Sequence, residues 1–154
     1  MKSYRKGVGI FLINREKKVF VGQRRDNGSE AWQMPQGGID KDEEPMTAAL
    51  RELEEEIGTR QVKVIYEHPG WIKYDLPQEL SSKLWGGQYA GQEQKWHLML
   101  LDGDDSLINI NTFCPEFKAW KWENPKNLPN IIVPFKKGLY QEILDDFLPF
   151  IDRL

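Results

Sequence analysis

Three closely spaced glutamates, Glu52, Glu55 and Glu56, are the residues of this chain best suited to chemistry. On a helix, positions three and four apart share one face, so these carboxylates would form a single acidic stripe. Like charges at that spacing repel, which costs an exposed helix a few tenths of a kcal/mol per pair. A cluster that tolerates this cost is a candidate site for a hard divalent cation bound through oxygen, Mg²⁺ or Mn²⁺.

The acidic stripe also has a simpler explanation, which is a solvent-exposed helix face built from good helix formers. Taken alone, the three glutamates favour that explanation over a metal site. Proline and acidic residues at positions 42–45 are typical of a first helical turn, and Gly58 is typical of a helix stop. A neighbouring apolar stripe predicts that the same helix packs on a core, through Met46, Ala49, Leu50, Leu53 and Ile57.

The residues around the stripe give a longer pattern with many fixed positions. Five residues separate Gly37 from Glu43, and seven separate Glu43 from Arg51-Glu52-Leu53. One residue then precedes Glu55-Glu56, and one more precedes Gly58-Thr59. This pattern resembles the Nudix box almost position for position, and chance would rarely produce it. One departure is Thr59, where the family usually has an aliphatic residue, and we expect this position to pack. The resemblance therefore favours the metal site.

Nudix proteins are typically Mg²⁺- or Mn²⁺-dependent pyrophosphohydrolases that act on a nucleoside diphosphate linked to another group. The resemblance implies that the carbonyl of Gly37 and the three glutamates hold the metal. It also implies that a box glutamate, or another acid brought close by the fold, takes the proton from the attacking water. Glu43 and Arg51 are expected to support the geometry between the loop and the helix.

Five segments outside the box resemble a subgroup, the bacterial RNA 5′-pyrophosphohydrolases and related dinucleoside polyphosphate hydrolases. They are YRKGVG at 4–9, WQMPQGG at 32–38, GQEQKW at 91–96, PEF at 115–117 and IVPFKKGLY at 132–140. In that subgroup the glutamate matching Glu116 reaches back to the metal site, so Glu116 is expected to be a remote ligand or the general base. Without the resemblance, Glu116 would be an ordinary exposed acid before a strand.

Basic and aromatic residues in and near these segments are the candidate substrate contacts. Arginine suits bidentate contacts to phosphate oxygens, and lysine supplies a mobile point charge. Arg24 and Arg25 point to opposite sides of a strand, and the sequence leaves open which of them faces the site. The subgroup resemblance places Phe135 near a nucleobase, where stacking is worth about 1–3 kcal/mol, and Tyr74 is a second aromatic candidate. The expected phosphate contacts are Arg5, Arg25, Lys95 and Lys136.

Strands and helices on both sides of the box must position these residues. Apolar runs predict strands over residues 8–13, 19–23, 61–68, 70–75, 94–101 and 117–122. A glycine-rich loop is expected at 26–38, an irregular excursion at 76–91 and an amphipathic helix at 134–148. This order indicates a mixed α/β domain. The resemblance implies a Nudix α-β-α sandwich (α+β) with a central mixed sheet, a catalytic loop–helix and a C-terminal helix.

Length and charge set the remaining expectations. A chain of 154 residues predicts one domain, residues 1–154, acting as a monomer or small homo-oligomer. The net charge of −3 provides no global basic field for long nucleic acid, so DNA is not an expected partner. The single cysteine, Cys114, fits a reducing compartment. No run approaches transmembrane length, and we expect a cytoplasmic protein.

The resulting hypothesis is metal-dependent hydrolysis of a phosphoanhydride in a nucleotide polyphosphate. The favoured substrate is the 5′-triphosphate or diphosphate end of RNA, which would be left as a 5′-monophosphate. One alternative is a dinucleoside polyphosphate such as diadenosine tetraphosphate, and another is a damaged nucleoside triphosphate. A non-catalytic nucleotide-binding regulatory module is the alternative from another class, although the intact box glutamates argue against it.

Overall fold

The computed structural model describes residues 2–25 and 30–154. In chain order, the main elements of that part are β1 (Ser3–Ile13), β2 (Val19–Arg24), β3 (Gln36–Gly38), α1 (Pro45–Ile57), β4 (Val62–Glu67), β5 (Ile72–Asp75), α2 (Gln78–Ser81), β6 (Tyr89–Leu101), β7 (Phe117–Glu123), α3 (Leu128–Ile131) and α4 (Lys137–Asp152). Short 3₁₀ turns include η1 (Leu84–Gly87) and η4 (Pro134–Lys136). Of the predicted loop at 26–38, the first four residues lie outside the described part.

The strands form one mixed sheet within the described residues, in the order β4-β6-β1-β2-β7, with β3 on β1 and β5 on β6. β1 is parallel to β6 and antiparallel to β2 and β3. Its second half is buried on both faces because successive side chains enter opposite cores. Phe11 and Ile13 belong to one core, and Val8, Ile10 and Leu12 belong to the other.

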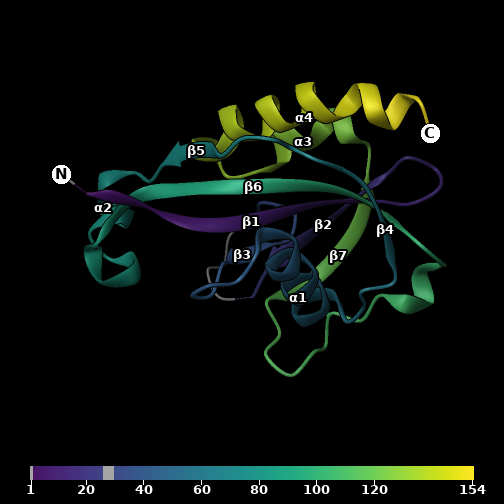
Figure 1. Cartoon of the computed structure of the whole chain (residues 1–154), viewed down its shortest axis with the longest axis horizontal. Helices are drawn as coiled ribbons and strands as arrows, with labels where there is room; N and C mark the ends of the chain where they lie inside the picture. The colour runs from purple at the N-terminus through teal and green to yellow at the C-terminus, as the bar shows by residue number, and fades with distance from the viewer. Residues whose placement is uncertain (1, 26–29) are drawn as a thin grey trace.

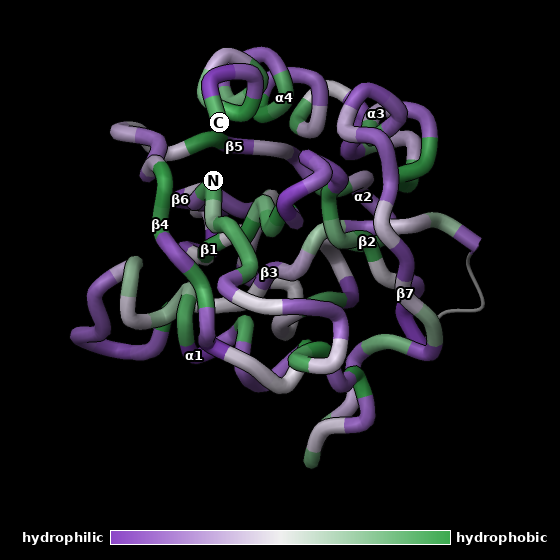
Figure 2. The backbone as a smooth tube through the Cα atoms, turned by 90° about the vertical axis from the view of Figure 1, so that its right-hand side faces the viewer, coloured by the Kyte–Doolittle hydropathy of each residue, from purple (hydrophilic) through white to green (hydrophobic). Residues whose placement is uncertain are grey.

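Helices α4 and α1 cover the two faces of this sheet (Figures 1 and 2). α4 packs through Leu139, Ile143 and Phe147, as the helical period predicts. α1 packs through Leu53 and Ile57 on the other core. The expected α-β-α sandwich around a central mixed sheet is therefore confirmed. No helix in the described ranges is long and apolar enough to cross a membrane.

Helix α1 begins and ends as its sequence predicts. Pro45 occupies the first turn, where its missing N–H costs no hydrogen bond. Gly58 ends the helix at φ 81°, and its N–H donates to the carbonyl of Glu54. Thr59 is buried, as expected for a packing position.

The predicted starts of two strands were wrong for a common reason. β1 begins at Ser3 and β6 at Tyr89, each five residues before the predicted start. These early halves carry polar side chains and pair with each other, for example Tyr4 with Gly91, so they show no apolar run. The predicted excursion at 76–91 contains α2 and η1, and the C-terminal helix extends past Pro149 to Asp152.

Candidate active site

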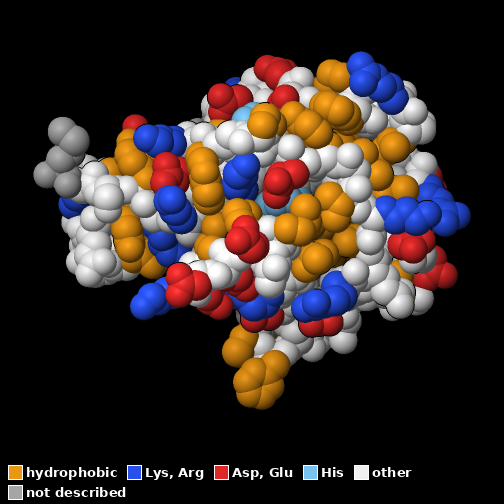
Figure 3. All heavy atoms as spheres, viewed as in Figure 1, with side chains coloured by type: hydrophobic (Ala, Val, Ile, Leu, Met, Phe, Trp, Pro, Cys, Tyr) orange, Lys and Arg blue, Asp and Glu red, His pale blue; other side chains and the backbone are white. Residues whose placement is uncertain are grey.

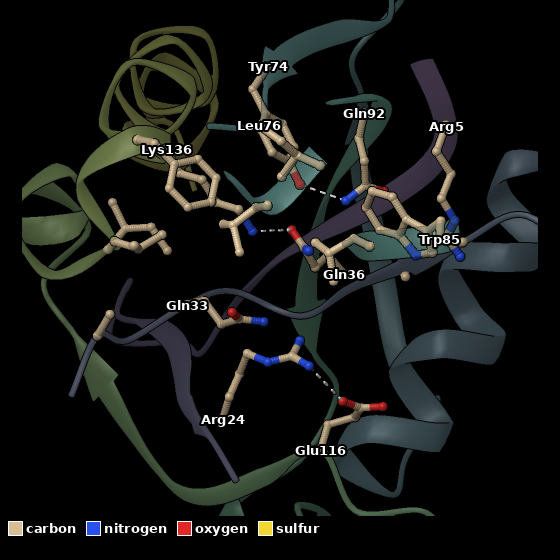
Figure 4. A pocket seen from close by; sticks show the side chains of 18 of the residues that line it. Arg5, Arg24, Gln33, Gln36, Tyr74, Leu76, Trp85, Gln92, Glu116 and Lys136 are labelled. Carbon is tan, nitrogen blue, oxygen red and sulfur yellow. Dashed lines mark hydrogen bonds and ion pairs between the residues drawn. The ribbon is translucent and has the colours of Figure 1, made fainter. Parts of the chain in front are cut away.

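A cavity of about 620 Å³ lies where β1, β3, β5 and β6 meet α1 and the start of α4 (Figure 4). Its wall combines three kinds of side chain. The acidic residues are Glu52, Glu56 and Glu116, and the basic residues are Arg5, Arg24 and Lys136. The aromatic residues are Tyr74, Trp85 and Phe135. Most residues that the sequence singled out are thus gathered in one place from distant parts of the chain.

Glu56 is the most unusual acid of the cavity because it is only 3% exposed. Its neighbours on the helix face, Leu53 and Ile57, carry it into the core side of α1. Burial, followed by the charges of Glu52 and Glu116, raises the pKa of Glu56 well above its usual range. Its Oε2 has no hydrogen-bond partner within the described part of the chain. A buried acceptor of this kind requires a partner, which residues 2–25 and 30–154 do not supply.

Arg51 ties the acidic helix to the preceding loop. Its Nε and Nη2 donate to the two oxygens of Glu43 at 2.9 and 2.8 Å, and Nη2 also donates to the carbonyl of Gly38 at 3.0 Å. This bidentate contact lowers the pKa of Glu43 to about 2. Nη1 reaches Glu52 at 2.9 Å and Glu55 at 3.3 Å. Arg51 thus connects Glu43 and the carbonyl of Gly38 to the glutamates of α1.

Helix α1 exposes charges that are paired rather than isolated. Figure 3 shows acidic and basic side chains next to one another over this helix. Glu55 belongs to this outer set, since its side chain is 56% exposed and contacts Arg51, and it does not line the cavity. The three box glutamates are therefore split: Glu52 and Glu56 face the cavity, and Glu55 lies outside it.

Gly37 brings the backbone of β3 against Glu52. A Cβ at this position would lie 2.0 Å from the carboxyl carbon of Glu52, so only glycine leaves room for that side chain. Glycine at position 37 therefore allows the carboxyl group of Glu52 to pack against β3.

Replacing Gly37 with alanine is expected to lower kcat by on the order of 10- to 100-fold with little change in Tm. The clashing group is the flexible end of Glu52, which moves more easily than β3 and would leave both the cavity wall and Arg51. Steady-state kinetics and thermal unfolding measure the two effects. Gly138→Ala is the matched control because its Cβ would meet nothing within 4 Å. An unchanged kcat in Gly37→Ala would contradict the expectation.

The donor atoms at the acidic end of the cavity are of the kind that binds a hard cation. These donors are oxygens, and the Oε2 of Glu56 is buried without a hydrogen-bond partner among the described residues. No three Asp, Glu, His or Cys side chains of residues 2–25 and 30–154 are gathered closely enough to hold one metal ion. Two of the box glutamates, Glu52 and Glu55, contact Arg51 instead.

Two of the predicted phosphate contacts lie away from the cavity. Arg24 lines it and approaches Glu116 at 3.7 Å, whereas Arg25 is exposed and outside its wall. By strand alternation, Arg24 shares a face of β2 with Phe20, which belongs to the same core as Leu53 of α1, and Arg25 has the opposite parity. Lys95 points to the other face of β6, where its Nζ donates to the carbonyls of His68 and Pro69 at 3.3 and 2.9 Å. Arg25 and Lys95, which were expected to contact phosphate, therefore do not line this cavity, and Arg24 takes the place expected of Arg25.

Tyr74, Phe135 and Lys136 form the aromatic end of the cavity. The two rings are 6.3 Å apart between centroids, and the Nζ of Lys136 lies 5.1 Å from the centroid of Tyr74. This amine also donates to Oε1 of Gln36 at 3.4 Å. Burial, followed by the charge of Arg24, lowers the pKa of Lys136 to about 8.

Sequence reasoning missed the glutamines and the tryptophan of the cavity. Gln92 donates to the hydroxyl of Tyr74 at 2.6 Å, and Gln94 donates to Gln36 at 3.3 Å. Strand alternation could have placed both glutamines on the inward face, because they share a face of β6 with the core residues Trp96 and Leu98. Trp85 lies on a 3₁₀ turn with no periodic signal.

Comparisons with known proteins agree with this geometry. The NUDIX domain family matches residues 3–143. The RNA pyrophosphohydrolase of Rhodospirillum rubrum is 52% identical over 147 residues, which cover 96% of this chain and 88% of that protein. The RNA pyrophosphohydrolase of Roseobacter denitrificans is 53% identical over 146 residues, covering 94% of this chain and 91% of that protein.

Among solved structures, a Caenorhabditis elegans Ap4A hydrolase has a TM-score of 0.69 at 19% identity, with 97% of this chain and 99% of that chain covered. The Escherichia coli dihydroneopterin triphosphate pyrophosphohydrolase has the same TM-score at 18% identity, with 94% and 99% covered. At these identities the likeness concerns the fold alone. Because the family match spans nearly the whole chain and the relatives share about half of its residues, this chain belongs to the Nudix hydrolase family.

Proposed function

We propose that this Nudix enzyme hydrolyses a phosphoanhydride at the 5′ end of RNA and leaves a 5′-monophosphate. One observation carries the proposal: a single cavity contains an acidic end, three cationic side chains and an aromatic end. A nucleotide polyphosphate has the complementary order of groups, since its anionic phosphates end on a nucleobase. The relatives named RNA pyrophosphohydrolases, about 50% identical over nearly the whole chain, support RNA as the source of that polyphosphate.

The cationic side chains are proposed to hold the phosphates. Arg5 and Arg24 present planar guanidinium groups suited to bidentate contacts, and Lys136 supplies a buried point charge. Phe135 is proposed to stack on a nucleobase beside Tyr74. Only the terminal nucleotides need to enter the cavity, so the net charge of −3 is compatible with an RNA substrate.

At the acidic end, Glu52, Glu55 and Glu56 with the carbonyl of Gly37 are proposed to hold a divalent cation, Mg²⁺ or Mn²⁺. When bound, such an ion neutralises phosphate charge and lowers the pKa of a coordinated water. Glu116, which lines the same cavity, is proposed as a further ligand or as the general base. We also infer that residues 1–154 form one catalytic domain and that it works in the cytoplasm, where the single cysteine would stay reduced.

The test is a comparison of two substrates. Purified protein with Mg²⁺ is given a short 5′-triphosphate RNA or diadenosine tetraphosphate at one ionic strength, and kcat/KM is measured for each. We expect the RNA to be preferred, and its kcat/KM to fall as salt rises because several phosphates are contacted. A preference for the dinucleotide would replace RNA with the alternative substrate. Cleavage of neither, with Mn²⁺ also tried, would favour the non-catalytic binding module.

A further inference from the structure

The segment between β5 and β6 brings one aromatic side chain to the cavity in a strained conformation. Trp85 has φ 49° and ψ 38°, and the next two residues, Gly86 and Gly87, also have positive φ, 69° and 73°. Glycine adopts this left-handed region freely, whereas a bulky residue such as tryptophan rarely does. Strain of this kind persists where the surrounding structure holds it, and it clusters at functional sites. The indole therefore calls for an explanation beyond turn formation.

The indole of Trp85 lies against the guanidinium group of Arg5 (Figure 4). The central carbon of that group is 4.8 Å from the centroid of the ring, which is a cation–π contact. The ring of Tyr89 packs edge-on against Trp85 at 6.0 Å. Stacking uses the flat face of the guanidinium group and leaves the N–H groups at its edge available for phosphate oxygens.

Two further contacts fix the other sides of Arg5. Its Nη1 donates to Oε1 of Gln92 at 3.3 Å, and Gln92 in turn donates to Tyr74. Gly38 of β3 lies so close that a Cβ there would be 2.2 Å from Nη2. No carboxylate of the described chain forms an ion pair with Arg5, whose guanidinium is held by neutral groups alone. Within residues 2–25 and 30–154, its positive charge is therefore not neutralised by a carboxylate.

We propose that Trp85 is a positioning residue that holds the guanidinium of Arg5 ready for the substrate phosphates. The segment between β5 and β6, which the box does not include, would thereby set the geometry of a phosphate contact. This inference rests on the proposed function, because it takes Arg5 to contact the polyphosphate. On this proposal, the strained backbone conformation of Trp85 serves to orient its ring toward Arg5.

The first test is a double-mutant cycle between these two residues. Trp85→Leu is expected to lower kcat/KM for 5′-triphosphate RNA by about tenfold, in line with a partly desolvated cation–π contact. Trp85→Phe, which keeps a ring, should retain most of the activity. In an Arg5→Ala background, Trp85→Leu should have little further effect because the guanidinium group that the indole positions is gone. Trp71→Leu is the matched control, since Trp71 makes the same kind of contact with Lys6, at 5.1 Å, outside the cavity wall.

A second measurement separates positioning from a purely structural role. Trp85→Gly removes the ring and relieves the left-handed backbone, so Tm should equal or exceed that of the parent while kcat/KM falls. Calorimetry with inorganic triphosphate and no divalent cation should show weaker binding by Trp85→Leu and unchanged binding by Trp71→Leu.

The outcomes distinguish this inference from the function on which it rests. Equal losses from Trp85→Leu in the parent and Arg5→Ala backgrounds would mean that the indole acts independently of Arg5, and would overturn the proposal. Full activity of Arg5→Ala would overturn it as well, while RNA hydrolysis itself would stand. A parent protein that cleaves no RNA would instead overturn the proposed function, and this inference with it.

Discussion

Glu56→Gln is expected to lower kcat by about 10³-fold and to leave the fold intact. The substitution keeps the size of the side chain and removes the negative charge that would face a divalent cation and the reacting phosphate. Loss of several kcal/mol of transition-state stabilisation corresponds to a rate change of that size. Glutamine should be tolerated because burial already disfavours the ionised form of Glu56 in the metal-free protein.

Steady-state kinetics with 5′-triphosphate RNA and denaturant unfolding of the metal-free protein measure the two effects. Glu54→Gln is the matched control on the same helix, because Glu54 is exposed and pairs with Arg60 at 3.1 Å. Glu55→Gln tests the outer glutamate, whose side chain contacts Arg51 and not the cavity. Turnover by Glu56→Gln equal to that of Glu54→Gln would remove Glu56 from the proposed metal site.

The part of the site that the sequence predicted lies on regular elements. The spacing of the box places Glu52 and Glu56 on one helix, and Gly58 ends that helix as expected. The burial of Glu56 also follows from spacing, since it is three residues after Leu53 and next to Ile57. Spacing alone groups Glu55 with Glu52 and Glu56, and only the structure shows that Glu55 lies outside the cavity.

The part that the sequence did not predict depends on tertiary arrangement and on irregular backbone. Strand alternation separates Arg24 from Arg25 and places Arg24 on the same face of β2 as Phe20, but the sequence does not tell which face of the strand carries the cavity. The place of Trp85 in the cavity wall depends on three successive left-handed residues, 85–87, in a segment without hydrophobic periodicity. The early half of β6 is polar because its inward face lines a cavity rather than a core, so hydrophobic patterns could not locate its start.

Lys136→Met is expected to stabilise the metal-free protein at pH 7 by at most about 3 kcal/mol while lowering kcat/KM about 100-fold. Lys136 is only 7% exposed, and its pKa is about 8 in the folded protein, against about 10.4 in an unfolded chain. Below pH 8 the folded protein therefore bears the full cost of a charged, buried amine. Methionine fills similar space without that charge, but it cannot attract a phosphate.

The lowered pKa of Lys136 also determines how the free energy of unfolding changes with pH. Between about pH 8 and 10.4 the unfolded chain binds a proton at Lys136 that the folded protein has lost, so the free energy of unfolding of the parent should rise with pH. The difference between Lys136→Met and the parent should therefore shrink over that range. Denaturant unfolding at several pH values measures it, with the exposed neighbour Lys137→Met as control.

A difference that stays constant from pH 7 to 10 would show that Lys136 keeps an ordinary pKa. An unchanged kcat/KM in Lys136→Met would remove this residue from the phosphate contacts. If both expectations hold, the protein retains a destabilising buried charge because the substrate requires it. Polyphosphate bound beside Lys136 would then raise the pKa of the amine again, and the free energy lost in the empty cavity would reappear as affinity for an anionic ligand.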